Sequence, residues 1–230
     1  MDNKIVLITG ASKGIGLSCA KLFLKNNYTV INASRTNLNP LKNSRYHFIK
    51  TDVAKEKDVR DLFDKVLKKF GKVDVLICNA GFGKFAYLAD STTKDFDEMF
   101  AVNVRGLYLC NRYVLKSMLE RKSGTILNIS SIAGKSGIAS ASIYSASKHA
   151  VMGLSSSLMA EVRKDNIRVV TICPGSTDTN FFDDPSAKLN SRRETLLSPD
   201  DVAESCLLAV RLPDRALMSE IEIRPLNPSK

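Results

Sequence analysis

The chain has 230 residues, of which 44% are hydrophobic and 25% are charged, a composition that excludes a disordered or fibrous protein. The formal net charge of +10 would suit nucleic acid or an acidic small molecule, but the basic residues are scattered, with no dense basic arm. We therefore expect no nucleic-acid partner, and with only two histidines we expect neither a metal site nor a His-based triad.

Short apolar runs alternate with amphipathic stretches along the whole chain. In chain order we expect strand Lys4–Ile8, helix Ile15–Lys25, strands Tyr28–Ala33 and Tyr46–Lys50, helix Lys55–Phe70, strand Val73–Cys78, one or two helices within Thr92–Arg121 interrupted near Asn103 and Gly106, strand Thr125–Ile129, helix Ser142–Arg163, strand Ile167–Cys173, a helix that opens at Ser198-Pro199, and strand Ile221–Arg224.

Nearly continuous apolar strands separated by amphipathic helices predict a parallel sheet covered on both faces. The expected fold class is α/β, a doubly wound sheet in a single domain over residues 1–230, with ligands bound outside the carboxyl ends of the strands. Thr179–Ser198 is the one loop long enough to serve as a lid.

The lengths of the apolar stretches and the spacing of the cysteines indicate the cellular compartment of the protein. No apolar stretch approaches the roughly 20 residues that span a bilayer, and the run Ile5–Ile8 is too short for a signal peptide. The five cysteines are widely spaced without a CxxC pair, which indicates buried, reduced thiols. We expect a cytoplasmic protein with no membrane partner.

A glycine cluster, Thr9-Gly10-Ala11-Ser12-Lys13-Gly14-Ile15-Gly16, lies between the first strand and the first helix. Glycines there allow a tight turn and let the backbone approach a pyrophosphate, which the helix N-terminus stabilises. The spacing is neither GxGxxG nor GxxxxGK[ST], which argues against a kinase or GTPase and points to a variant dinucleotide-binding loop.

The end of the second strand, Asn32-Ala33-Ser34-Arg35-Thr36, should face the adenosine ribose and contains no carboxylate. A carboxylate there would accept from the ribose 2′-hydroxyl and favour NAD, whereas cations favour a 2′-phosphate. Arg35 offers a planar fork for phosphate and Lys13 projects from the glycine loop, so we expect NADP(H) as the cofactor.

Tyr144 and Lys148 share one face of the expected helix Ser142–Arg163. A nearby ammonium stabilises a phenolate, and we expect it to lower the pKa of Tyr144 into the range for proton transfer. A second YxxxK, Tyr46 to Lys50, falls in an expected strand, where residues four apart are about 13 Å apart, so we interpret it as structural. Ser131, after the strand Thr125–Ile129, can donate to the same carbonyl oxygen.

Six motifs in this order together resemble the short-chain dehydrogenase/reductase family, in its NADP-preferring branch. They are Thr9-Gly10-xxx-Gly14-x-Gly16, Cys78-Asn79-Ala80-Gly81, Asn103, Asn128-Ile129-Ser130-Ser131, Tyr144-xxx-Lys148 and Pro174-Gly175. Cys78 replaces the first asparagine of the usual NNAG, and Thr177 replaces the usual Val or Ile of PGxVxT. The resemblance implies a Rossmann-like fold of about seven strands and an oligomer, a homodimer or homotetramer, formed through the helices that carry Asn103 and Tyr144.

The resemblance also implies a role for each matching residue. Tyr144 would be the general acid in reduction, Ser131 rather than Ser130 the catalytic serine, Lys148 the group that lowers the phenol pKa and holds the nicotinamide ribose, and Asn103 the holder of a water linking lysine to solvent. The expected cofactor contacts are Gly10, Ser12, Lys13, Gly14, Ile15, Gly16, Ser34, Arg35, Asp52, Val53, Asn79, Ala80, Gly81, Tyr144, Lys148, Pro174, Gly175, Thr177 and Thr179.

The sequence therefore predicts an oxidoreductase that interconverts a carbonyl and a secondary alcohol. The expected substrates are a small ketone or diketone, a 3-hydroxy acid or a pterin-like compound, and the basic net charge leaves open a substrate that carries negative charge. A 3-oxoacyl-thioester reductase and a non-catalytic dinucleotide-binding regulator are the alternatives. Ser145-xx-Lys148 is also an SxxK, but the SDN and KTG motifs that accompany it in β-lactamase-type hydrolases are absent.

Overall fold

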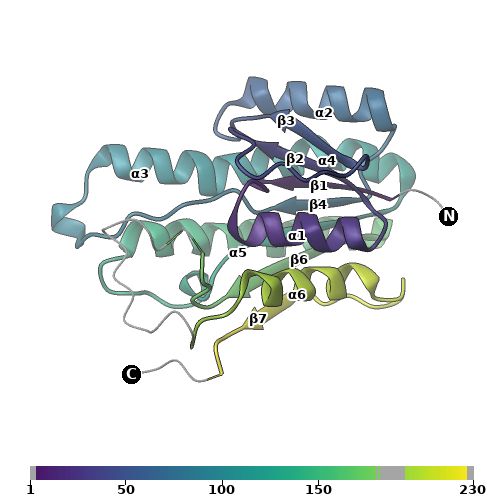
Figure 1. Cartoon of the computed structure of the whole chain (residues 1–230). Coiled ribbons are helices and arrows are strands. Elements are labelled where there is room, and N and C mark those ends of the chain that lie inside the picture. The colour runs from purple at the N-terminus through teal and green to yellow at the C-terminus, as the bar shows by residue number, and fades with distance from the viewer. Residues whose placement is uncertain (1–3, 180, 182–194, 227–230) are drawn as a thin grey trace.

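Seven parallel strands form one sheet in the computed structural model, which describes residues 4–179, 181 and 195–226. The spatial order is β3-β2-β1-β4-β5-β6-β7 (Figure 1). The strands are β1 Ile5–Thr9, β2 Thr29–Ser34, β3 Tyr46–Lys50, β4 Val75–Cys78, β5 Gly124–Ile129, β6 Ile167–Pro174 and β7 Glu220–Ile223. This is the doubly wound α/β fold predicted from the sequence.

Helices cover both faces of the sheet. The α-helices are α1 Gly14–Lys25, α2 Glu56–Phe70, α3 Thr93–Phe100, α4 Leu107–Arg121, α5 Ser142–Val162 and α6 Pro199–Arg211, and a π-helical segment, η2 Ala101–Gly106, joins α3 to α4. Short 3₁₀ turns are η1 Leu88–Asp90, η3 Ile132–Gly134 and η4 Arg163–Asp165. In Figure 1 α1 and α6 lie in front of the sheet, whereas α4 and α5 lie behind it.

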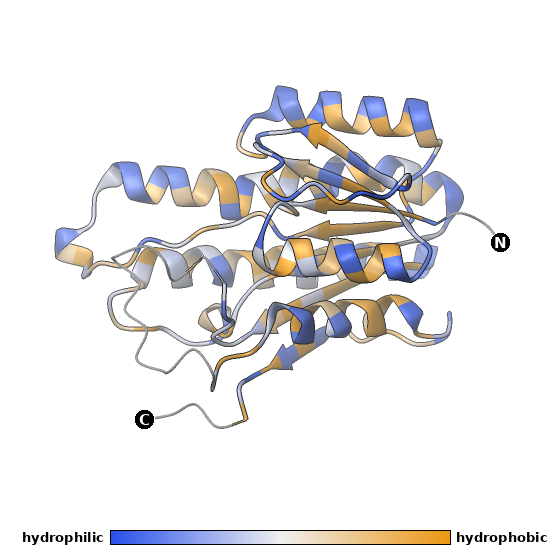
Figure 2. Ribbon diagram, in the orientation of Figure 1, coloured by the Kyte–Doolittle hydropathy of each residue, from blue (hydrophilic) through white to orange (hydrophobic). Residues whose placement is uncertain are grey.

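Two buried apolar clusters, one on each face, hold the three layers together. Alternation along a strand separates them: in β1, Leu7 packs with residues of α2 and α4, whereas Val6 and Ile8 pack with residues of α1 and α6. Every residue of β1, β2 and β4 is buried. Figure 2 shows the consequence, with hydrophobic strands inside and hydrophilic residues along the outer faces of the helices. Burial on both faces explains why these strands are apolar without interruption.

The ends of helices α1, α2 and α5 and of the strands agree with the sequence-based prediction within two residues. The interruption expected near Asn103 and Gly106 is a π-helix rather than a break, so α3, η2 and α4 run on continuously. Such π-segments insert one extra residue into a helical turn and often occur at functional sites. Of the expected lid Thr179–Ser198, residues 180 and 182–194 lie outside the described parts.

The order of the strands places a crevice above the centre of the sheet. The chain runs outward from β1 through β2 to β3, then returns to β4 on the other side of β1. The two connections from β1 and β4 therefore leave the sheet in opposite directions, and ligands of doubly wound sheets bind where this happens. Among the described residues, no helix is long and apolar enough to cross a membrane.

Candidate active site

The loop after β1 meets the loop after β4 at the carboxyl end of the sheet. Gly10 has φ of +71°, and a Cβ there would lie 3.0 Å from Ala80 Cα. A Cβ on Gly16 would lie 2.5 Å from Asn79 Nδ2 and from Gly10 O. Side chains at either position would thus collide with the neighbouring loop, which gives these glycines a packing reason as well as a phosphate-binding one.

Thr9 and Asn79 tie the two loops together. Thr9 Oγ1 accepts from the backbone N–H groups of Asn79 and Ala80, both at 3.0 Å. Asn79 Nδ2 in turn donates to the carbonyls of Thr9 at 3.0 Å and Gly10 at 3.1 Å. Asn79 and Ala80 do lie along the crevice, but the Asn79 amide supports the glycine loop. The sequence analysis named Thr9 as the first residue of the glycine motif but gave its side chain no role.

At the end of β2, the glycine loop is tied to the segment that carries Arg35. The Ser12 hydroxyl donates to the carbonyl of Thr36, and Asn39 Nδ2 donates to the carbonyl of Ser12 at 2.8 Å. These bonds hold the neighbours of Lys13 and Arg35 side by side, and both cationic side chains are exposed. The structure thus brings the two predicted cations to one end of the crevice.

The buried side-chain amide of Asn32 supports the end of β2 through hydrogen bonds. Asn32, which is fully buried, donates to Tyr46 Oη at 2.8 Å and accepts from Ser34 Oγ at 2.5 Å. Tyr46 then donates to Asn37 Oδ1 at 3.0 Å. Tyr46 lies in β3, as expected for the YxxxK that we interpreted as structural. Its hydroxyl nevertheless orders the loop that leads away from Arg35.

Asp52 and Val53 follow β3 and turn the chain toward α2. The Asp52 carboxylate accepts from the backbone N–H of Ala54 at 3.1 Å, while its own N–H donates to Asp58 at 3.1 Å. Val53 is buried, and a Cβ on Gly106 would lie 2.9 Å from Val53 Cγ2. Val53 therefore packs against the π-helical segment that holds Asn103.

Tyr144 and Lys148 lie on the first turns of α5 and are both buried, with 9% and 6% of their surface exposed. The phenol shares a hydrogen bond with Ser131, and Lys148 Nζ lies 5.8 Å from the centre of the Tyr144 ring. Lys148 Nζ donates to the carbonyl of Ile129, at the end of β5, at 3.0 Å. The predicted Ser–Tyr–Lys set is thus gathered at one point of the crevice.

The pKa values of this pair differ from the sequence-based expectation. Burial raises the pKa of Tyr144 to about 12, and the hydrogen bond with Ser131 acts in the opposite direction. Burial lowers the pKa of Lys148 to about 8, and Cys173 acts in the opposite direction. The expected lowering of the phenol pKa was wrong for this structure, because loss of hydration outweighs every favourable interaction.

Asn103 is 2% exposed and lies in the π-helical segment. Its side chain forms a reciprocal pair with the backbone of Phe82, accepting from the N–H at 3.0 Å and donating to the carbonyl at 2.9 Å. It also donates to Ser147 Oγ at 3.1 Å, and a Cβ on Gly81 would lie 3.1 Å from Asn103 Oδ1 and 3.7 Å from Lys148 Nζ. Asn103 therefore joins the loop after β4 to α5.

Two adjacent serines follow β5 and have separate contacts. Ser130 is 3% exposed and donates to the carbonyl of Lys148 at 3.2 Å, which fixes α5 to the sheet. Ser131 contacts the Tyr144 phenol and accepts from the backbone N–H of Ala133 at 3.1 Å. The two serines therefore interact with different parts of α5, Ser131 with the Tyr144 phenol and Ser130 with the backbone of Lys148.

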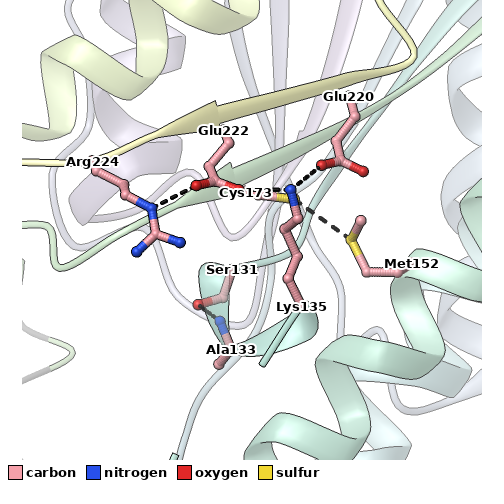
Figure 3. A network of polar contacts seen from close by, with 8 residues as sticks. All are labelled: Ser131, Ala133, Lys135, Met152, Cys173, Glu220, Glu222 and Arg224. Carbon is pink, nitrogen blue, oxygen red and sulfur yellow. Dashed lines mark hydrogen bonds and ion pairs between the residues drawn. The ribbon is translucent and has the colours of Figure 1, made fainter. Parts of the chain in front are cut away.

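A double ion pair anchors the turn that follows Ser131. Lys135 Nζ lies 2.6 Å from Glu220 Oε1 and 2.6 Å from Glu222 Oε2, both on the edge strand β7. Arg224 holds Glu222 from the other side at 2.5 Å (Figure 3). The sequence carries no signal for this contact, since it joins segments far apart in the chain.

The segment after β6 closes the crevice over the glycine loop. Pro174 ends β6, and the backbone N–H of Gly175 donates to the carbonyl of Ile223 at 2.8 Å. Thr177 Oγ1 donates to the carbonyl of Gly175 at 3.0 Å. A Cβ on Gly14 would lie 3.3 Å from Thr179 Cγ2. The loops after β1, β4 and β6 therefore meet at the carboxyl edge of the sheet.

The residues present fit a phosphorylated dinucleotide. The glycine loop leaves space where side chains would collide, the N-terminus of α1 opens beside it, and two exposed cations lie at the end of β2. In the described parts of the chain, clusters of histidine, cysteine or acidic side chains that could hold a metal ion are absent.

Comparison with known proteins identifies the class. The family described as short chain dehydrogenase matches residues 4–190, and the chain belongs to this family. An uncharacterized oxidoreductase of Staphylococcus aureus is 32% identical over 98% of this chain and 99% of its own length. The resemblance drawn from the six motifs is thereby confirmed.

Solved structures agree with the fold. ElxO with NADP bound superposes with a TM-score of 0.88 at 32% identity, covering 96% of this chain and 97% of its own. The closed form of a serine dehydrogenase complexed with NADP⁺ superposes with a TM-score of 0.87 at 26% identity, covering 98% of this chain and 96% of its own.

Proposed function

We propose that this protein is an NADP(H)-dependent oxidoreductase that interconverts a carbonyl and a secondary alcohol by hydride transfer. The observation that carries the proposal is the buried Tyr144 phenol, which shares a hydrogen bond with Ser131 beside Lys148. NADP(H), when bound, supplies or accepts the hydride. The chain itself provides the proton, the orientation of the carbonyl and a site from which water is excluded.

Each residue has a distinct part in carbonyl reduction. Tyr144 is the general acid, and a phenol with a raised pKa is fully protonated at neutral pH, as the reduction direction requires. Ser131 donates a second hydrogen bond to the substrate oxygen. Lys148 would hold the nicotinamide ribose. Asn103 holds the loop after β4 against α5 and would hold a water that links lysine to solvent.

The choice of NADP(H) rests on the end of β2. Arg35 and Lys13 bind the 2′-phosphate of the adenosine ribose, where a carboxylate would instead bind the hydroxyl of NAD. The related structures of ElxO and of the serine dehydrogenase both hold NADP. The residues that would hold the cofactor are Gly10, Ser12, Lys13, Gly14, Ile15, Gly16, Ser34, Arg35, Asp52, Val53, Asn79, Ala80, Gly81, Tyr144, Lys148, Pro174, Gly175, Thr177 and Thr179.

Replacing the phenol tests the mechanism. Tyr144→Phe removes only the hydroxyl, so we expect kcat for NADPH-dependent carbonyl reduction to fall by a factor of about 10² to 10⁴, the usual contribution of a general acid. The Kd of NADPH, measured by its fluorescence, should stay unchanged because the ring still packs in place.

Tyr46→Phe is the matched control, since Tyr46 belongs to the YxxxK in β3. It should leave kcat at saturating NADPH unchanged. Near-normal turnover by Tyr144→Phe would contradict the proposed role of the phenol, and weak binding of both NADPH and NADH by the wild-type protein would contradict the dinucleotide site.

The substrate class is a small ketone or diketone, a 3-hydroxy acid or a pterin-like compound. The serine dehydrogenase supports the 3-hydroxy acid as a second candidate, because its substrate is an amino acid with a hydroxyl on the β-carbon. A panel of these compounds together with a 3-oxoacyl thioester, with NADPH oxidation or NADP⁺ reduction as the readout, shows which class the protein converts.

We further propose that the chain is one functional unit over residues 1–230, that it is cytoplasmic and that it assembles as a homo-oligomer. A groove between α3, η2, α4 and α5 is lined mainly by apolar side chains, with one acidic and one basic residue: Phe100, Ala101, Val104, Tyr108 and Leu154, with Asp97 and Arg105. Tyr108 and Leu154 are 44% and 37% exposed. A second copy of the chain would cover this apolar surface, which lies on the helices that carry Asn103 and Tyr144.

A further inference from the structure

Three aromatic rings, one of them that of Tyr144, meet in the candidate active site. The ring centres are 5.7 Å apart for Phe85 and Tyr144, 5.5 Å for Tyr144 and Phe181, and 5.8 Å for Phe85 and Phe181. The interplanar angles are 49°, 55° and 81°, within the tilted and edge-to-face geometry that aromatic pairs prefer. Phe85 follows β4 and Phe181 follows β6, so two separate loops bring their rings to the tyrosine.

A glycine makes this approach possible. Gly83 is buried, and a Cβ on it would lie 2.7 Å from Phe181 Cζ and 3.1 Å from Phe85 Cε2. Any side chain at position 83 would therefore push the two phenylalanines away from each other. The contact depends on three positions in two loops, none of which belongs to the motifs identified in the sequence.

The surroundings of the rings are apolar. Buried Met99, Ala133 and Ala141 pack with Tyr144, and the partly buried Phe82 and Ile143 pack against this cluster. Lys84, between Gly83 and Phe85, is ion-paired with Asp95 at 2.5 Å. An anionic group placed among the rings would lose its hydration and would have to compete with Asp95 for that lysine, which is costly.

We propose that Phe85 and Phe181 form an aromatic clamp beside Tyr144 that selects carbonyl substrates with an uncharged, apolar substituent, best an aromatic ring. This deepens the proposed function and rests on it, since the carbonyl must reach Tyr144 Oη. The substituent stacks against the phenylalanine rings while the carbonyl oxygen faces Tyr144 and Ser131. Among the substrate classes considered above, the clamp favours ketones and diketones over hydroxy acids.

Two matched ligands test the charge preference. 1-Phenyl-1,2-propanedione and benzoylformate present the same phenyl ketone, but benzoylformate carries a carboxylate in place of the acetyl group. We expect the diketone to have a kcat/KM with NADPH at least about tenfold higher, a difference of about 1.4 kcal/mol in transition-state binding. Calorimetric titration of both compounds into the NADP⁺-loaded wild-type protein measures the same preference without turnover.

Variants then assign the preference to the clamp. Phe181→Ala and Phe85→Ala should each weaken binding of the phenyl diketone by about tenfold, while 2,3-butanedione, which has no ring to stack, changes little. Gly83→Ala, which keeps both rings but separates them, should act in the same direction. Phe181→Tyr should retain the wild-type affinity, and Tyr87→Ala is the matched control because Tyr87 is 69% exposed and lies outside the clamp.

The outcomes are distinct. Equal or tighter binding of benzoylformate, or an unchanged affinity for the phenyl diketone in both alanine variants, would overturn the clamp. Failure of the wild-type protein to reduce any carbonyl would instead overturn the proposed function, and the calorimetric preference would still decide the clamp. Unchanged NADPH affinity and thermal stability in the variants exclude a general loss of folding as the cause.

Discussion

At the scale of single residues, the Tyr144–Lys148 pair shows that burial controls the charges of this site. Lys148 is buried, and its ammonium donates to the carbonyl of Ile129. Burial lowers its pKa to about 8 from the ordinary value of 10.5. Burying the Lys148 ammonium lowers the stability of the folded protein, and active sites commonly sacrifice stability for function in this way.

This cost has a defined pH window. Below about pH 8 the lysine is protonated in the folded and unfolded states, and the full cost of burying the ammonium is present. Between about pH 8 and 10.5 the folded state loses its proton first, so the cost falls as the pH rises and is gone above 10.5.

Lys148→Met should therefore stabilise the protein without cofactor at pH 7. We expect a gain on the order of 2 kcal/mol, because two to three pKa units are worth about 3 kcal/mol and the lost hydrogen bond offsets about 1 kcal/mol. Denaturant unfolding at pH 7 and pH 10 measures this. A gain that does not shrink at the higher pH would show that the ammonium is not the cause.

Arg35 determines the cofactor preference at the same scale. Arg35→Ala should lower kcat/KM for NADPH by tenfold or more, since a charge-assisted hydrogen bond to phosphate contributes about 1.5–3 kcal/mol. The value for NADH should stay unchanged, because NADH carries no 2′-phosphate. Arg60→Ala, on the exposed face of α2, is the control. Parallel losses with both cofactors would contradict the assignment.

At the scale of elements, the edge strand β7 supports the turn that carries Ser131. Lys135 bridges η3 to Glu220 and Glu222, and the carboxylates hold the pKa of Lys135 well above its usual range. Lys135 and Arg224 lower the pKa of Glu222. The ion pairs are therefore formed at neutral pH and are lost as the pH falls through the lowered pKa of Glu222.

Lys135→Met should loosen this turn rather than unfold the protein, because the ion pairs are solvent-exposed and contribute little to global stability. We expect faster amide exchange at Gly134 and Lys135 and a lower kcat with an unchanged Kd for NADPH. Lys135→Arg should restore kcat. High salt should reproduce part of the loss in the wild-type protein, and an equal loss in the arginine variant would indicate a purely local packing effect.

Most elements of the fold were predictable from the sequence because hydrophobic periodicity follows directly from burial on two faces of a parallel sheet. Many of the predicted site residues lie close together because the loops that carry them follow parallel strands, which end at one edge of the sheet, whereas Asn103, Tyr144 and Lys148 are brought there by η2 and α5. The contact of Phe85 with Phe181 and the Lys135 bridge were not predictable, since each joins distant segments without a motif. The bonds between Thr9 and Asn79 join two recognised motifs, but the sequence does not show that these motifs touch. The predicted direction of the Tyr144 pKa shift was wrong for a related reason: the depth to which the phenol is buried depends on packing by residues from other loops.

At the scale of the whole molecule, the exposed face of η2, α4 and α5 predicts self-association. Tyr108→Glu places a charge in the apolar groove and should convert the oligomer to a monomer, as measured by sedimentation velocity. Tyr87→Glu, on a different exposed surface, should leave the oligomer intact. A wild-type protein that sediments as a monomer at every concentration would contradict the proposed assembly.

The distribution of the thiols allows each layer of the molecule to be followed separately. All five cysteines are free and buried. Cys19 of α1 interacts with Cys206 of α6 in one helical layer, and Cys78 of β4 interacts with Cys110 of α4 in the other. A thiol reagent can modify a pair only when its layer opens. Two variants that each retain one pair would therefore report, by their labelling rates, which side of the sheet detaches first and whether a bound cofactor slows both sides equally.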